Sequence, residues 1–60
     1  MKAQLTLTVD IGEPANREWA KRVLLDNLDD LVTKALAEGQ ITGDTDLEVE
    51  AHTRDIVIFE

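Results

Sequence analysis

The sequence contains no cysteine, no serine and no tyrosine. Without cysteine the chain can form neither a disulfide nor a thiolate zinc site. Without serine or cysteine it also lacks the usual catalytic nucleophiles, for which threonine, lysine and carboxylates are weak substitutes. We expect the 60 residues to form one domain, residues 1–60, near the lower size limit for folding alone. Because domains this small commonly need disulfides, a metal or oligomerisation, a homodimer is the leading expectation.

Cofactor and metal motifs are missing as well. The three glycines, Gly12, Gly39 and Gly43, match no phosphate-binding fingerprint. The acidic residues do not follow the calcium-loop pattern, and His52 is the only histidine. The sequence therefore predicts a protein that is not an enzyme and that uses no cofactor or metal. A small enzyme or metal-dependent factor built on His52 is the least favoured alternative.

Basic residues are few. The chain has six lysines and arginines and thirteen aspartates and glutamates, so its net charge is −7. This balance argues against direct binding to nucleic acid, which requires basic neutralisation of phosphates, and against an anionic membrane surface. A basic protein surface is the partner that charge favours. The alternative is that the charge only keeps a small protein soluble. No apolar run resembles a signal peptide or a membrane span, so a cytoplasmic location is expected.

Residue periodicity indicates four elements in the order β-α-β-β. Alternation of apolar and polar residues predicts a strand over residues 2–11, and a broad apolar stripe predicts a helix over residues 15–38 ending at Gly39. Further strands are expected over residues 47–51 and 56–59, joined by a tight turn or bulge near residues 53–54. One long bent strand is the alternative to this hairpin.

The expected fold class is α+β. Two parallel strands joined through a right-handed helical crossover would leave room for the last strand between them. This gives a small three-stranded mixed sheet with strand order 1-3-2 and the helix packed on one face. A central position would explain why residues 56–59 are apolar on both faces.

Carboxylates occupy every second position along one stretch, at Asp44, Asp46, Glu48 and Glu50. In a strand all four would project from one face, about 6.5 Å apart, because a strand rises about 3.3 Å per residue. We interpret this row as a partner-binding surface. The alternative is that charge simply protects an edge strand from aggregation. Three helix residues on one face extend the candidate surface: Trp19, Asp26 and Asp30. Tryptophan is enriched in binding hot spots, although the favoured interpretation of Trp19 alone is that it closes the end of a small core.

Self-association would use the last strand. A single helix covers one face of a sheet, so two of the residues Ile56, Val57, Ile58 and Phe59 would emerge on the open face. Exposed apolar patches on small soluble proteins usually mark contacts.

Two functional hypotheses follow. The first is a non-enzymatic small acidic interaction protein, such as an inhibitor or regulator from a phage or mobile element, that presents its carboxylate row to a basic protein surface. The second is a homo-oligomeric structural or scaffold protein that works through the apolar open face of its sheet.

Overall fold

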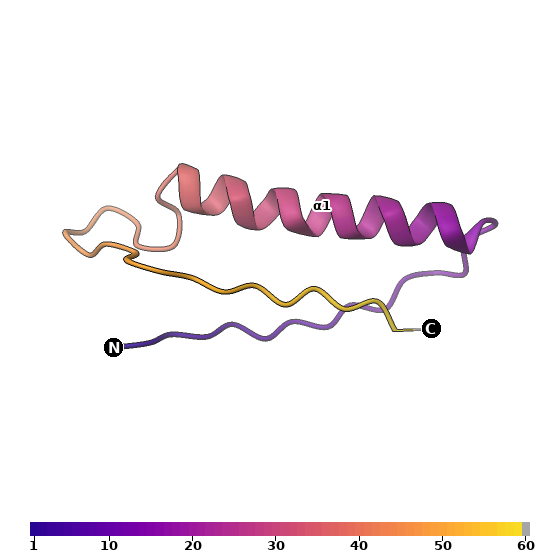
Figure 1. Cartoon of the computed structure of the whole chain (residues 1–60), viewed down its shortest axis with the longest axis horizontal. Coiled ribbons are helices and arrows are strands. Elements are labelled where there is room, and N and C mark those ends of the chain that lie inside the picture. The colour runs from indigo at the N-terminus through magenta and orange to yellow at the C-terminus, as the bar shows by residue number, and fades with distance from the viewer. Residues whose placement is uncertain (60) are drawn as a thin grey trace.

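A computed structural model describes residues 1–59 and contains one regular element, the helix α1, Arg17–Ala37. An extended stretch lies on each side of it in the sequence (Figure 1). We call residues 2–11 the N-terminal segment and residues 47–59 the C-terminal segment. Both run under the helix, and the loop of residues 38–46 joins α1 to the C-terminal segment.

The start of α1 is set by local chemistry. Asn16 has extended backbone angles and its side chain accepts a hydrogen bond from the backbone N–H of Trp19 at 3.0 Å, which satisfies one of the free donors of the first turn. The Arg17 guanidinium binds the Glu13 carboxylate across the entry to the helix at 2.7 Å. The predicted helix is therefore confirmed, with a start two residues later than periodicity indicated.

The end of α1 also follows the prediction. Gly39 has φ +69°, a left-handed conformation that costs glycine little. The N–H of Gln40 donates to the carbonyl of Ala35 at 2.9 Å, and the N–H of Gly39 donates to the carbonyl of Leu36 at 3.4 Å. These two bonds form a Schellman motif, which satisfies carbonyls that the helix leaves open.

The predicted three-stranded sheet with order 1-3-2 is wrong, because no residue from 1 to 59 belongs to a β-strand. The chain by itself is therefore not the expected α+β domain. The turn predicted at residues 53–54 is also wrong: the C-terminal segment continues past it in one direction, so no hairpin forms and no strand returns to the centre (Figure 1).

The side chains of the C-terminal segment explain this difference. Unbroken alternation from Leu47 would turn Asp55 toward the helix. In the structure Arg54 contacts α1 and Ile56 and Ile58 are half-buried, so the even-numbered residues face the helix there. Because Arg54 is bound to α1, the segment keeps its even-numbered side chains toward the helix without reversing direction.

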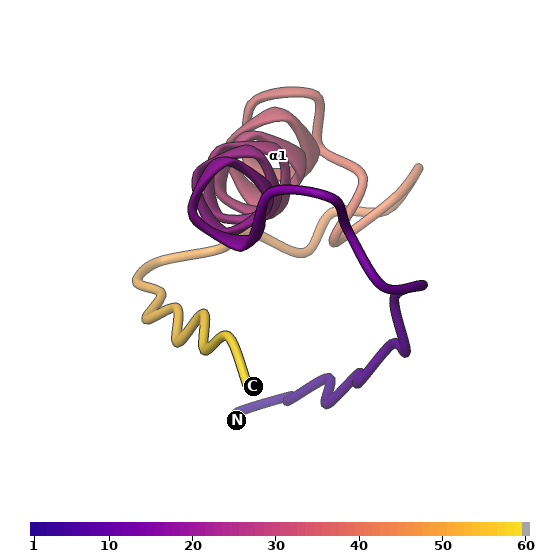
Figure 2. The ribbon, with the colours of Figure 1, turned by 90° about the vertical axis from the view of Figure 1, so that its right-hand side faces the viewer.

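The two segments run in the same direction (Figure 1) and do not lie side by side (Figure 2). Because α1 returns the chain along its full length of roughly 31 Å, at about 1.5 Å per residue, both segments begin at the same end of the molecule. The views of Figures 1 and 2 together give a right-handed crossover from the first segment through α1 to the second. This is the usual hand for parallel strands that belong to one sheet.

No side chain among residues 1–59 is buried. The accessible surface is 5921 Å², whereas a compact monomer of this mass exposes about 3,900 Å². The Cα radius of gyration is 14.2 Å, against about 10 Å for a compact chain of this length. The single chain is therefore an open structure that leaves some 2,000 Å² more surface in water than a compact fold would.

Candidate protein-interaction groove

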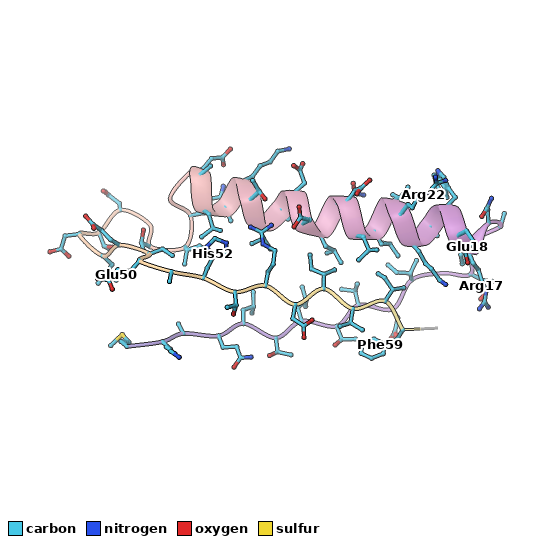
Figure 3. The ribbon with its side chains drawn as sticks, in the orientation of Figure 1. Arg17, Glu18, Arg22, Glu50, His52 and Phe59 are labelled. Carbon is cyan, nitrogen blue, oxygen red and sulfur yellow. The ribbon has the colours of Figure 1, made fainter. Side chains whose placement is uncertain are left out.

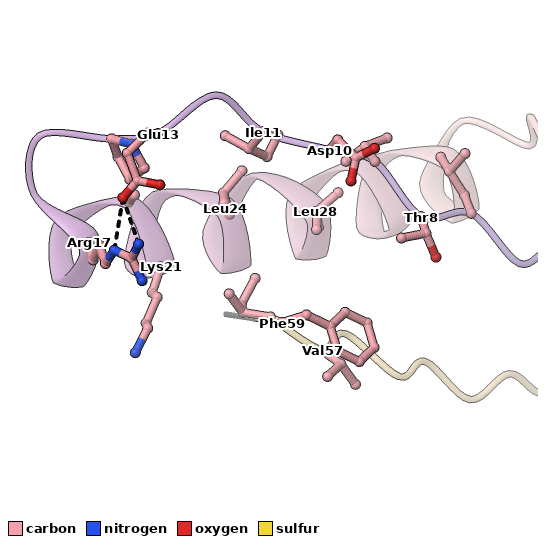
Figure 4. A pocket seen from close by; sticks show the side chains of 15 residues that line it. Thr8, Asp10, Ile11, Glu13, Arg17, Lys21, Leu24, Leu28, Val57 and Phe59 are labelled. Atoms are coloured by element: carbon pink, nitrogen blue, oxygen red, sulfur yellow. Dashed lines mark hydrogen bonds and ion pairs between the residues drawn. The ribbon is translucent and has the colours of Figure 1, made fainter.

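An open groove runs beneath α1 between the two segments. One part has a volume of about 410 Å³ and lies near the start of α1. The other has a volume of about 1,630 Å³ and lies toward its end. Leu7, Leu28 and Val57 line both parts, so the two form one continuous trough. Figure 4 shows the first part, with Ile11 on one side, Val57 and Phe59 on the other, and Leu24 and Leu28 between them.

The roof of the groove is the apolar stripe of α1 that the sequence predicted. Ala20, Leu24, Leu28 and Ala35 are half-buried, whereas Leu31 in the same stripe remains 63% exposed. The helix therefore offers an apolar face that residues 1–59 cover only in part.

The walls of the groove carry unused hydrogen-bonding groups. Among the described residues, no backbone N–H or C=O in residues 2–11 or 48–59 has a hydrogen-bond partner. Each extended segment thus presents donors and acceptors at strand spacing along the groove. Side chains of alternating polarity accompany them, and Leu5 and Leu7 are 88% and 74% exposed.

The four residues predicted for self-association are divided between two faces. Ile56 and Ile58 are half-buried against the helix side. Val57 is 54% exposed and Phe59 80% exposed, and Phe59 points away from α1 (Figure 3). The predicted alternation within residues 56–59 therefore holds, although the segment lies at one side of the groove rather than in its centre.

A polar anchor fixes the C-terminal segment to the helix. The Arg54 guanidinium donates to the Asp29 carboxylate at 2.5 Å, to the Asp29 carbonyl at 3.2 Å and to the Thr33 hydroxyl at 3.0 Å. His52 Nε2 lies 3.4 Å from a second Arg54 nitrogen. Sequence reasoning missed this anchor. Its only local signal is that Arg54 is the one lysine or arginine after Lys34, because the partners are 21 and 25 residues away.

The carboxylate row does not lie on one strand face. Asp44 and Asp46 belong to a bend, where the Thr45 hydroxyl donates to the Thr42 carbonyl at 2.8 Å and accepts from the N–H of Leu47 at 3.2 Å. Glu48 and Glu50 begin the extended segment. All four carboxylates are exposed, and none forms an ion pair within the described part of the chain. We call these four residues the acidic end.

The helix residues of the predicted partner surface lie apart from the acidic end. Trp19 is in the first turn of α1, roughly 27 Å along the axis from the last turn at 1.5 Å per residue. Its side chain is 55% exposed and does not close a core. Asp26 is exposed, and the Asp30 carboxylate pairs with Lys34 at 3.0 Å. The structure therefore splits the predicted surface into a helix face and an acidic end.

Metal-binding side chains do not converge in the described structure, where no group of three or more histidines or acids could hold an ion. His52 lies beside the anchor, on the helix side of its segment (Figure 3). α1 is too polar to cross a membrane, and the described residues contain no other helix to consider.

Comparison with known proteins supplies no relative for this chain. No family model matches the sequence, and no curated protein or solved structure matches it either. The groove, the anchor and the acidic end are therefore the features that bear on its function.

Proposed function

We propose that this chain is a non-enzymatic interaction protein whose binding surface is the groove. One observation carries the proposal: the groove has two parallel walls of unpaired backbone groups and an apolar roof. An extended polypeptide laid between the walls would pair with both and cover the stripe of α1. Addition of a strand to exposed edges is a recurrent mode of peptide recognition.

The dimensions support a polypeptide rather than a small molecule. Small-molecule sites are enclosed pockets of about 300–1,000 Å³ with a few convergent polar groups. The larger part of this groove has a volume of about 1,630 Å³, and the trough follows most of the helix. Unpaired backbone groups repeat along both walls, which matches a ligand with its own repeating backbone.

Hydrogen exchange read by mass spectrometry tests the proposal. In the isolated monomer, amides of residues 4–10 and 48–58 should exchange nearly as fast as in an unfolded chain. In the assembly purified from the producing cells, the same amides should be protected, while residues 44–46, whose N–H groups have no hydrogen-bond partner in the chain, remain unprotected as an internal control. Protection in a verified monomer, or an assembly that leaves both segments unprotected, would contradict the proposal.

A second candidate function uses the acidic end to contact a basic protein surface, as a small acidic inhibitor or regulator does. The observation in its favour is that Asp44, Asp46, Glu48 and Glu50 are all exposed without cationic partners. Such binding weakens strongly with salt.

Charge-matched variants test this second candidate. Binding to an immobilised lysine-rich peptide would be measured in low and high salt. Asp46→Lys with Glu48→Lys should lose this binding. Asp26→Lys with Asp30→Lys changes the net charge equally on the helix face and should retain most of it. Equal losses would show that net charge alone is responsible.

A further inference from the structure

The surplus surface of the chain is the amount that a dimer would cover. The excess of about 2,000 Å² over a compact monomer falls within the roughly 1,000–2,500 Å² that each partner contributes to an obligate homodimer. It includes apolar side chains along the N-terminal segment, with Val9 and Ile11 at 55% and 54% exposure. A partner that enters the groove must therefore be an extended, half-apolar strand, and this chain contains such a strand.

Two-fold symmetry limits how two copies can fill each other's grooves. Suppose that the two-fold axis is perpendicular to the plane that contains the two segments. Either the two N-terminal segments or the two C-terminal segments then become neighbours at the centre of the shared sheet. In both cases the central pair is antiparallel, and each copy's groove receives one segment of the other. The choice between the two depends on what the central strands carry.

Charge favours the N-terminal segment for the central position. Central C-terminal segments would bring together two copies of a stretch that contains Glu48, Glu50 and Asp55. The N-terminal segment carries only Lys2 and Asp10, and neither forms an ion pair among residues 1–59. Placing it in the centre leaves the acidic stretch at the outer edges, where charge protects against further strand addition.

The N-terminal segment is also complementary to itself in one register. Apolar side chains of both copies share a face only if paired residue numbers sum to an even value, because side chains alternate along a strand. With a sum of 12, Lys2 of each copy lies opposite Asp10 of the other, Leu5 lies opposite Leu7, and Thr6 lies opposite its own copy. Opposite charges and paired threonines are favourable cross-strand neighbours.

We propose that two copies of this chain interlock, each placing its N-terminal segment in the groove of the other. The result is a four-stranded antiparallel sheet shared by the two chains, in the order C-terminal, N-terminal, N-terminal, C-terminal segment, with Thr6 on the two-fold axis. Both helices cover one face. Each protomer then forms a split β-α-β unit, whose parallel strands are separated by a strand from the other chain. This inference rests on the proposed role of the groove as a polypeptide site.

Single cysteines test the register, because the natural chain has none. In Thr6→Cys the two thiols would face each other across neighbouring strands, where Cα atoms are about 4.5–5.5 Å apart, within the range of a disulfide. Mild oxidation should convert it almost completely to a covalent dimer. Thr8→Cys is the matched control: its thiol would lie opposite Gln4, four residues from its own copy, and should remain largely reduced. Efficient linkage of Thr8→Cys instead would overturn the register.

A charge exchange tests the same pairing without oxidation. Asp10→Lys places like charges opposite each other twice per dimer and should weaken dimerisation roughly 5- to 30-fold, since each cross-strand pair contributes tenths of a kcal/mol to about 1 kcal/mol. Adding Lys2→Glu to Asp10→Lys should restore most of the affinity. Analytical ultracentrifugation measures the dissociation constant of the dimer for the natural chain, the single variant and the double variant. A double variant no better than Asp10→Lys alone would overturn the pairing.

Failure of this inference can be distinguished from failure of the groove as a polypeptide site. A protein that stays monomeric, but whose two segments become protected from exchange when a different chain binds, overturns the interlocked dimer and leaves the groove function standing. Covalent linkage through Val57→Cys in preference to Thr6→Cys overturns the strand order. A monomer with protected segments overturns both proposals.

Discussion

At the residue scale, two side chains make the contacts that define the structure, one with a near neighbour in the sequence and one with distant residues. Asn16 begins α1 by accepting from the N–H of Trp19, and Arg54 attaches the far segment to Asp29 and Thr33. The first is a contact over three residues, of a kind that sequence patterns describe well. The second joins residues 21 and 25 positions apart, across the last turns of α1 and the whole loop of residues 38–46, and no local pattern predicts it.

Replacing Asn16 tests the first contact. Asn16→Ala should lower the free energy of unfolding by about 1 kcal/mol, because a first-turn donor loses its acceptor. Asn27→Ala is the matched control, because Asn27 is an exposed helix residue and alanine has the higher helix propensity. It should leave stability unchanged or slightly higher. Urea denaturation followed by circular dichroism at 222 nm measures both, and equal losses would contradict the assigned cap.

Replacing Arg54 tests the anchor. The Arg54 side chain is 28% exposed and Asp29 is 58% exposed, so the ion pair itself contributes less than about 1 kcal/mol. Arg54→Ala should nevertheless cost about 1 kcal/mol, because the hydrogen bonds to the Asp29 carbonyl and Thr33 are also lost. Arg17→Ala removes the more exposed pair with Glu13 and should cost less. Faster amide exchange in residues 52–58 of Arg54→Ala, but not of Arg17→Ala, would identify the anchor as the cause.

At the element scale, the sequence predicts the helix well and the pairing of the extended segments poorly. The stripe around Leu24 and Leu28 and the glycine at position 39 locate α1 to within two residues, because helix hydrogen bonds connect near neighbours. Alternation from Ala3 to Ile11 likewise predicts an extended segment with one apolar face. It does not say which strand lies beside that segment, since pairing joins residues far apart or in different chains. The predicted hairpin failed for this reason.

Glycine substitutions test how α1 ends. Gly39→Ala should destabilise the protein by about 1 kcal/mol, because alanine is strained at φ +69°. No atom lies within 4 Å of the added Cβ, so the cost comes from the backbone alone. Gly12 is equally free of neighbours and does not have a positive φ; Gly12→Ala should therefore be neutral or stabilising by up to about 1 kcal/mol. Thermal unfolding of both variants gives the comparison, and similar midpoints would contradict it.

At the scale of the whole molecule, the absence of any buried side chain in residues 1–59 dominates the energetics. Burial of a leucine side chain stabilises a fold by about 1.5–3 kcal/mol only when the side chain is fully withdrawn from water. Here even the apolar stripe of α1 is half-exposed. Ordering each residue costs about 1–2 kcal/mol of backbone entropy. An isolated chain should therefore be marginal in stability, and the proposed dimer would supply the missing burial.

Stability should accordingly depend on protein concentration. For an interlocked dimer the thermal midpoint rises as the protein is concentrated, because association is linked to folding. Differential scanning calorimetry over a hundredfold range of concentration measures this dependence. A midpoint that is constant over this range would indicate a self-sufficient monomer.

Salt should strengthen the assembly. Each chain carries a net charge of −7, so two copies repel each other until ions screen the charge, with a Debye length of about 10 Å at 0.1 M ionic strength. We expect the dimer to dissociate less at 0.5 M than at 0.05 M sodium chloride in sedimentation experiments. Binding of the acidic end to a basic partner would change in the opposite direction, which separates the two kinds of contact.

The unequal attachment of the two segments also has a kinetic consequence. Arg54 holds the C-terminal segment on α1, whereas residues 2–11 make no hydrogen bond to the rest of the described chain. The helix and its anchored segment can therefore form within one chain, whereas in the proposed interlocked dimer the N-terminal segment becomes ordered only when a second molecule binds. Refolding should show a fast first-order phase in helix formation, followed by a second-order phase whose half-time is halved when the chain concentration is doubled.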